Sequence, residues 1–222
     1  MNPISPITRI DQVRQAILEL IFSGKLKPGE RLVEARLAAQ FGVSQATVNA
    51  ALQTLHDQAI VSKILNRSTN VCLYTEREIN NLFSVRLLLE PAAAEAVSRR
   101  FSAEIRAALM RPVEAMRLAA RDGDLPGFCL ADYNFHQELY RLTDNPVLIQ
   151  ACQAIAAAPF AFVLCDHPSA LPTDYTRLAE DHFEVILALE QGPEAAAEIT
   201  RDRVAAWRIH SERALAERAV HA

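Results

Sequence analysis

Hydrophobic positions in the first quarter of the chain recur with the period of two short helices joined by a tight turn. Ala35–Phe41 is rich in helix-forming residues, and Gly42 suits the left-handed cap that ends a helix. Ser44 is a favoured N-cap for a second helix, whose apolar stripe at i, i+4 and i+7 is formed by Val48, Leu52 and Leu55. Its opposite face carries four polar residues, Gln45, Thr47, Asn49 and Gln53. This pattern predicts a helix–turn–helix, the element that places its second helix in the major groove of DNA.

The segments on either side extend this unit. Arg9–Ser23 has the apolar periodicity of a helix, and Lys27–Glu30 has the composition of a turn. Ile60–Ile64 and Val71–Tyr74 are β-type runs that flank the polar segment Asn66–Asn70 and predict a hairpin, or wing. Residues 1–75 are therefore predicted to form a winged helix–turn–helix DNA-binding domain.

From Thr75 onward the hydrophobic period is helical almost throughout. Six helices with short, turn-like links are predicted, at Glu76–Arg100, Ala103–Arg121, Leu125–Leu142, Pro146–Cys165, Thr173–Glu190 and Pro193–Ala219. The predicted fold is mainly α, with the winged domain followed by an all-α helical bundle over residues 76–222. Because the winged domain has little surplus apolar surface, we expect this second domain to form the dimer interface.

Charge is divided unevenly between the two predicted domains. Residues 1–75 hold eight Lys or Arg against five Asp or Glu, whereas the remainder holds 15 against 22. A mildly basic first domain on an acidic body fits phosphate contact confined to that domain. The four cysteines form no C-x-x-C pair, and no apolar run approaches the roughly 20 residues needed to cross a bilayer. These features predict a cytoplasmic protein with free thiols and no membrane partner.

Several segments resemble a known family of regulators. SGKLKPGERLVEARLAAQFGVS (residues 23–44) is similar to the N-terminal signature of the GntR regulators. Leu82–Ala96, Leu130–Leu148 and Glu180–Gly192 resemble the helical FCD effector domain of the FadR-type branch of that family. The resemblance implies a homodimeric bacterial transcription factor that binds a double-stranded DNA operator. It also implies that a small metabolite, often a carboxylate, sets its affinity for DNA.

The predicted recognition helix departs from the family pattern. The family usually has S-R-T-P-V-R-E-A-L, where this chain has Ser44-Gln45-Ala46-Thr47-Val48-Asn49-Ala50-Ala51-Leu52. Two arginines are thus replaced by Gln45 and Asn49, whose amides pair well with adenine, whereas arginine prefers guanine. Arg67 at the wing tip is a candidate for backbone or minor-groove contact, or else a solvated hairpin residue. The predicted DNA-binding residues are Arg36, Ser44, Gln45, Thr47, Asn49 and Arg67.

A candidate metal site lies in the second domain. Asp132 and His136 are at i, i+4 on one predicted helix, and His182 lies on an inward-facing position of another. These residues match three of the four metal ligands of metal-binding FCD domains, and their N and O donors suit Zn, Ni or Mn. The alternative is a helical Asp–His hydrogen bond with a satisfied core histidine. The fourth family ligand, a histidine, falls on Val204 or Arg203, neither of which is a metal ligand.

The same residues are candidates for effector binding, together with two arginines. Arg203 could hold an effector carboxylate through a bidentate pair. Arg86 matches an arginine that reaches the effector cavity in such domains, and pairing with Glu90 one turn on is the alternative. The predicted effector-binding residues are Arg86, Asp132, His136, His182 and Arg203, with Tyr133, Asn134 and Tyr140 as further candidates by proximity.

These observations favour a ligand-responsive, DNA-binding transcriptional regulator that acts as a repressor. They do not favour an enzyme. One alternative is a metal-dependent hydrolase built on Asp132, His136 and His182. That reading requires a nucleophile or general base beside an open metal position, and the chain offers no such motif. A second alternative, motivated by Gln45 and Asn49, is a regulator that has lost specific DNA binding.

Overall fold

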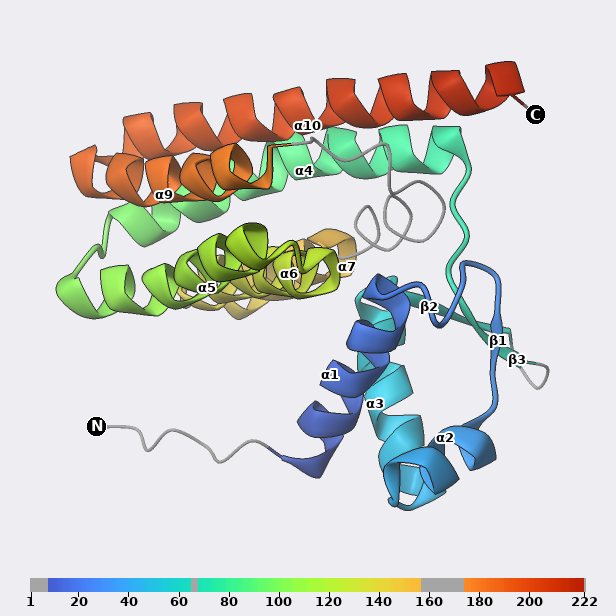
Figure 1. The fold of residues 1–222 in the computed structure, drawn as a ribbon. Helices are drawn as coiled ribbons and strands as arrows, with labels where there is room; N and C mark the ends of the chain where they lie inside the picture. Colours follow the sequence, from blue (N-terminus) through green and yellow to red (C-terminus); the bar gives the residue numbers. More distant parts are fainter. Residues whose placement is uncertain (1–7, 65–67, 157–173, 222) are drawn as a thin grey trace.

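The computed structural model describes residues 8–64, 68–156 and 174–221, and it is mainly helical (Figure 1). The N-terminal part contains three helices and a three-stranded sheet. Its elements are α1 (Arg9–Phe22), β1 (Arg31–Leu32), α2 (Glu34–Phe41), α3 (Gln45–Asp57), β2 (Val61–Ile64) and β3 (Ser68–Val71). We refer to this part as the DNA-binding domain.

The predicted turn between α2 and α3 has the expected backbone geometry. Gly42 ends α2 in the left-handed conformation, with φ of 64°, and Ser44 caps α3 by accepting a hydrogen bond from the Thr47 N–H at 3.1 Å. The predicted apolar stripe of α3 is fully buried at Val48, Leu52 and Leu55. The helix–turn–helix prediction is confirmed.

The sheet differs from the predicted hairpin. Its order is β1-β3-β2, with β3 antiparallel to both neighbours. The predicted second run, Val71–Tyr74, is wrong: β3 spans Ser68–Val71, and the short strand β1 was not predicted. The polar residues of β3 form a strand because both of its edges are hydrogen-bonded, and such pairing outweighs intrinsic preference. The candidate residue Arg67 lies outside the described residues.

The C-terminal part is a bundle of helices, which we call the helical domain. Its described elements are α4 (Glu76–Ser98), α5 (Ala103–Asp122), α6 (Leu125–Arg141), α7 (Pro146–Ala156), α9 (Tyr175–Gln191) and α10 (Pro193–His221). Five of the six predicted helices agree with these bounds to within two residues. The predicted helix Pro146–Cys165 is observed to Ala156, and its remainder lies outside the described residues.

The helices of this bundle form two layers, of which the one that contains α6 faces the DNA-binding domain (Figure 1). In Figure 1, α4 and α10 run side by side, α9 continues the same layer, and α5, α6 and α7 lie beneath them. The DNA-binding domain contacts the bundle through α1, which meets α6. None of the described helices is both long and apolar enough to span a bilayer.

Candidate functional site

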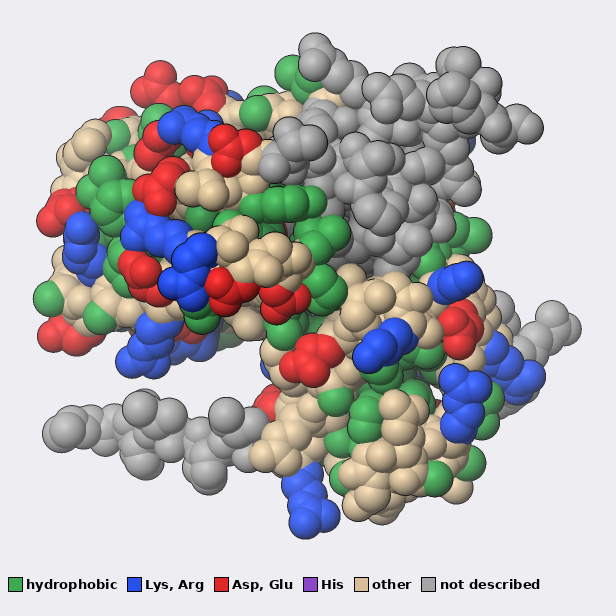
Figure 2. Space-filling view, viewed as in Figure 1, with side chains coloured by type: hydrophobic (Ala, Val, Ile, Leu, Met, Phe, Trp, Pro, Cys, Tyr) green, Lys and Arg blue, Asp and Glu red, His purple; other side chains and the backbone are tan. Residues whose placement is uncertain are grey.

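The predicted DNA-contacting face of α3 is exposed. Gln45 and Asn49 are open to solvent, as is Ser44, and Thr47 is half-buried. The guanidinium of Arg36 on α2 is exposed and lies 3.8 Å from the Glu30 carboxylate. Figure 2 shows few charged side chains over the turn between α2 and α3, while Lys and Arg gather over the sheet. The surface offered to a groove is therefore rich in hydrogen-bonding groups and poor in charge.

Asn49 has a partner that the sequence did not reveal. Its Nδ2 donates a hydrogen bond to Glu34 Oε1 on α2 at 2.7 Å. A bidentate contact with adenine needs both the donor and the acceptor of this amide. Base recognition by Asn49 therefore exchanges an intramolecular hydrogen bond for an intermolecular one.

A cavity of about 250 Å³ lies inside the helical domain, with walls from α4, α6, α9 and α10. Half of its lining is apolar, formed by Phe135, Leu139, Leu178, Val185, Val204, Ala206 and Trp207. The polar half is formed by Arg86, Glu90, His136, Asp181, His182, Thr200 and Arg203. Four of the five predicted effector residues therefore line one cavity, and the fifth, Asp132, contacts His182 beside it. A small apolar space with a few convergent polar groups is typical of a ligand site.

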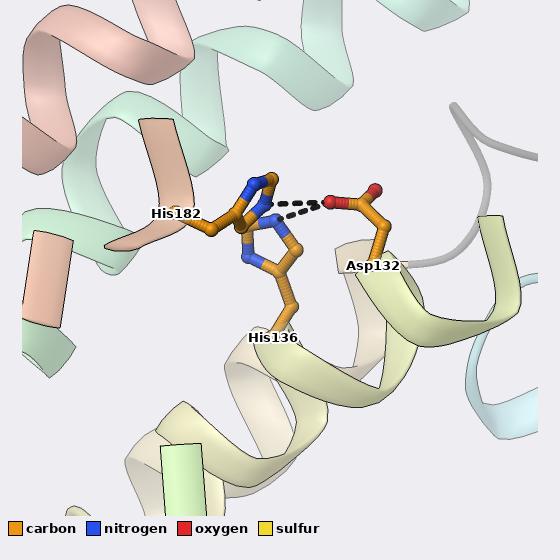
Figure 3. A group of neighbouring side chains, drawn as sticks. All are labelled: Asp132, His136 and His182. Carbon is orange, nitrogen blue, oxygen red and sulfur yellow. Dashed lines mark ion pairs between the residues drawn. The ribbon is translucent and has the colours of Figure 1, made fainter. Parts of the chain in front are cut away.

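Asp132, His136 and His182 converge as predicted, two from α6 and one from α9 (Figure 3). Asp132 Oδ1 lies 2.6 Å from His182 Nε2 and 3.9 Å from His136 Nε2. One ligand atom from each residue lies within 4.8 Å of the others. His182 Nδ1 donates to the Leu178 carbonyl at 2.8 Å, which turns Nε2 toward the carboxylate.

The pKa values of the two histidines shift in opposite directions because their surroundings differ. Burial lowers the pKa of His136 and outweighs the attraction of Glu90 and Asp132. Burial also opposes the charge on His182, but the contact with Asp132 outweighs it and raises the pKa of His182. The short contact between Asp132 and His182 therefore favours the protonated form of His182.

Both cavity arginines already have carboxylate partners. Arg86 Nε donates to Glu90 Oε1 at 2.6 Å, and both side chains are about 99% buried or more. Tyr140 also donates to Glu90 Oε1, at 2.7 Å. Burial opposes the charge on Arg86, yet Glu90 and Tyr140 outweigh it and raise the pKa of Arg86. Arg203 contacts the carboxylates of Asp181, at 3.0 Å, and Glu184.

Comparison with known proteins places these features in a family. The sequence profile of the bacterial regulatory proteins of the gntR family matches residues 9–71, and that of the FCD domain matches residues 81–206. The chain belongs to the GntR family of transcriptional regulators, with an FCD effector domain. It is a ligand-responsive DNA-binding regulator and not an enzyme, so the hydrolase alternative is set aside.

Individual relatives agree with this assignment. The chain is 29% identical over 204 residues to the "Probable D-xylose utilization operon transcriptional repressor" of Paenarthrobacter nicotinovorans, covering 90% of this chain and 87% of that protein. It is 28% identical to the histidine utilization repressor of Klebsiella aerogenes, covering 93% and 81%. Among solved structures, Escherichia coli McbR/YncC is similar in fold, with a TM-score of 0.70 at 21% identity over 94% of this chain and 99% of that one.

This GntR-family chain departs from the metal-binding FCD pattern at the position of the fourth ligand. Val204 is 3% exposed and lines the cavity, and Arg203 beside it pairs with acids. The family position is therefore inside the site, but it carries a side chain that cannot bind a metal. A metal held here would have three protein ligands, Asp132, His136 and His182.

Sequence reasoning missed or misplaced several residues around the cavity. Thr200 is 4% exposed, lines the cavity, and its hydroxyl has no hydrogen-bond partner among the described residues. Its position one turn before Val204 was the signal that could have found it. Tyr133 and Asn134 were candidates by proximity, but Tyr133 faces the DNA-binding domain and Asn134 lines a groove between α5 and α6. Helical rotation of about 100° per residue separates them from the Asp132 face.

Proposed function

We propose that this regulator is a cytoplasmic homodimer that represses a metabolic operon, and that a small organic acid in the cavity of the helical domain sets its operator affinity. The relatives named above are repressors of sugar and amino-acid utilization operons, which supports the sign of regulation. In the homodimer, each α3 would enter one half-site of a palindromic operator. The full-length protein should sediment at twice its chain mass of 24.6 kDa, and a monomer bound to a single half-site would contradict the dimer.

The observation that carries the effector proposal is the charge balance of the cavity. Arg86 is matched by Glu90, and Arg203 is matched by Asp181 and Glu184. A carboxylate placed against either arginine would compete with a carboxylate already bound there. An anionic effector therefore needs another cation, which we assign to a divalent metal on Asp132, His136 and His182.

The donor set fits such a metal. A metal-binding histidine generally donates its second ring N–H to a carbonyl or carboxylate, which fixes the free nitrogen toward the ion. His182 does this through Leu178, and His136 Nδ1 faces Glu90 Oε2 at 3.6 Å. With nitrogen and oxygen donors, Zn, Ni and Mn are the natural candidates. The bound ion would supply the positive charge that an effector carboxylate requires.

Thermal unfolding with a panel of organic acids tests this proposal. Untagged protein would be stripped with a chelator, divided, and one half reloaded with Zn²⁺, Ni²⁺ or Mn²⁺. We expect an acid to raise the Tm of the reloaded protein but not of the stripped protein, because ligand binding stabilises the folded state. Elemental analysis should find one metal per chain, and none in His182→Ala.

Arg203→Ala serves as the matched variant for the alternative mode of binding. If an acid stabilises the metal-free protein and Arg203→Ala abolishes that effect, the arginine holds the effector and the metal assignment is wrong. If the response survives in His136→Ala, His182→Ala and Arg203→Ala alike, the effector binds elsewhere.

A further inference from the structure

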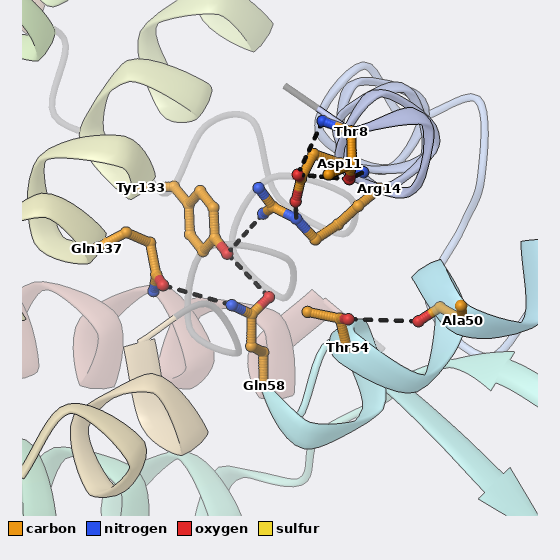
Figure 4. A network of polar contacts seen from close by, with 8 residues as sticks. All are labelled: Thr8, Asp11, Arg14, Ala50, Thr54, Gln58, Tyr133 and Gln137. Carbon is orange, nitrogen blue, oxygen red and sulfur yellow. Dashed lines mark hydrogen bonds and ion pairs between the residues drawn. The ribbon is translucent and has the colours of Figure 1, made fainter. Parts of the chain in front are cut away.

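One hydroxyl joins the helical domain to two helices of the DNA-binding domain (Figure 4). Tyr133 on α6 accepts a hydrogen bond from Arg14 Nη1 on α1 at 3.3 Å and donates one to Gln58 Oε1 at 2.9 Å. Gln58 Nε2 in turn donates to Gln137 Oε1 on α6 at 3.3 Å. We call these four residues the interdomain contact.

The centre of the interdomain contact is shielded from water, whereas Arg14 and Gln137 at its edges are half-buried. Tyr133 is 0% exposed and Gln58 is 6% exposed. The Phe22 ring of α1 packs against the Tyr133 ring, with 6.4 Å between centroids. Hydrogen bonds in such surroundings are stronger than in water, and an unpaired member is costly. The contact therefore specifies one placement of the two domains rather than a loose set of them.

Spacing along α6 connects this contact with the cavity. Tyr133 and Gln137 are at i, i+4, and so are Asp132 and His136, which gives two parallel stripes one residue apart. Adjacent residues differ by about 100° around a helix. The same helix therefore presents one stripe to the cavity and the next to the DNA-binding domain. Because the helix moves as a unit, a shift that repositions the first stripe also displaces the second.

On the DNA-binding side, the contact holds the recognition helix at its end. Gln58 is the C-cap of α3, and Arg14 belongs to α1, which packs along α3. The opposite end of α3 carries Ser44, Gln45 and Asn49. A displacement at Gln58 therefore changes the angle at which α3 is presented to DNA.

We propose that the Tyr133 hydroxyl is the positioning group that couples the cavity to the recognition helix. A ligand in the cavity contacts the Asp132–His136 stripe and shifts α6. This shift changes the hydrogen bonds that Tyr133 makes with Gln58 and Arg14, and the DNA-binding domain then adopts a second placement. This regulation rests on the proposed function in that a ligand occupies the cavity. By linkage, DNA bound to α3 must affect the cavity in return, and that direction can be tested without knowing the effector.

The chain carries its own reporter for that test. Trp207 is its single tryptophan, and it lines the cavity. The probe is a duplex selected from random-sequence DNA by binding to the wild-type protein, added to saturation. We expect the duplex to change Trp207 emission in wild type, and this change to be lost or strongly reduced in Tyr133→Phe, which removes the hydroxyl and keeps the ring.

The control is Tyr175→Phe, the same substitution on α9, where the ring packs against Phe128 with 5.2 Å between centroids. It should retain the full emission change. Gln58→Ala removes the partner of Tyr133 from the other domain and should reproduce the Tyr133→Phe result. The double variant should then lose no more than either single one, because both remove one contact. An emission change of wild-type size in Tyr133→Phe, or no change in the wild type, would overturn the proposal.

Zn²⁺ titration separates this proposal from the one on which it rests. If Zn²⁺ binds, its affinity should differ between free and DNA-bound wild type by a factor in the usual allosteric range of about 5 to 150. That factor should approach 1 in Tyr133→Phe while Zn²⁺ and DNA each still bind. If Zn²⁺ does not bind at all, the metal assignment fails, and the emission change upon DNA binding still decides the coupling.

Discussion

The two domains place their functional polar groups in opposite surroundings. In the DNA-binding domain, Gln45 and Asn49 stand exposed on α3. In the helical domain, Arg86, Glu90 and Asp132 are almost completely buried; Arg86 pairs with Glu90, and Asp132 lies 2.6 Å from His182 Nε2. Exposed groups can change partners at little cost, whereas buried charges depend on the partner they have. The first domain is therefore built to exchange contacts with DNA, and the second to hold a fixed set of charges around a cavity.

The largest effect should come from breaking a buried charge pair. Glu90→Gln leaves the Arg86 guanidinium buried without its counter-charge, and we expect the free energy of unfolding to fall by about 3–5 kcal/mol. Urea denaturation measures this loss. Glu95→Gln is the matched control, because Glu95 pairs with Arg99 at the same i, i+4 spacing on α4 but on the exposed surface. It should cost no more than about 1 kcal/mol, and equal losses in the two variants would contradict the comparison.

The exposed amide of Asn49 should affect DNA discrimination and leave stability nearly unchanged. Asn49→Ala removes a candidate adenine contact, so preference for a selected duplex over point-substituted duplexes should fall by about 1–3 kcal/mol. Gln53→Ala, one turn further along the same face, is the control and should keep that preference. Arg36→Ala should weaken all duplexes evenly and reduce the salt dependence of binding. Unchanged discrimination in Asn49→Ala would exclude readout by this amide.

Two buried threonine hydroxyls, one without and one with a hydrogen-bond partner, should have opposite effects on stability when each threonine is replaced by valine. The Thr200 hydroxyl has no hydrogen-bond partner among the described residues, whereas the buried Thr143 hydroxyl donates to the Tyr140 carbonyl at 2.8 Å. Thr200→Val should leave the stability of the ligand-free protein unchanged or raise it by about 1 kcal/mol, and Thr143→Val should lower it by about the same amount. Thermal unfolding measures both. A destabilised Thr200→Val would show that this hydroxyl is satisfied in the ligand-free protein.

The smallest effect concerns the start of α4, where the chain passes from the DNA-binding domain into the helical domain. Thr75 and Glu78 form a capping box, and the hydrogen bonds from Thr75 lower the pKa of Glu78. A pKa lowered by folding contributes stability above the unfolded pKa, and this contribution is lost as the pH falls through the folded pKa. Thr75→Ala should raise the Glu78 pKa toward its ordinary value and cost about 0.5–1 kcal/mol at neutral pH. Titration by NMR measures the pKa, and Thr75→Ser should preserve it.

In both domains, sequence reasoning succeeded where local signals specify the structure and failed where packing or strand pairing does. The α2–α3 turn was predictable because local signals specify it: Gly42 as the C-cap, Ser44 as the N-cap and a short apolar stripe. The convergence of Asp132 with His136 was predictable from i, i+4 spacing. The partners of Arg203 and Tyr133 were not, because they depend on how helices pack. The strand β1 was missed because two residues carry no periodicity, and they form a strand only through pairing with β3.

The two stripes of α6 also bear on how regulators of this kind can diversify. The α6 residues proposed to hold the metal and its ligand, at 132 and 136, are different from those that contact the DNA-binding domain, at 133 and 137. A substitution in the first stripe would then change the proposed ligand site without removing a hydrogen bond of the second stripe. Under the proposed coupling, a new effector specificity would require mutation of the cavity alone, while the contact with the DNA-binding domain would be kept.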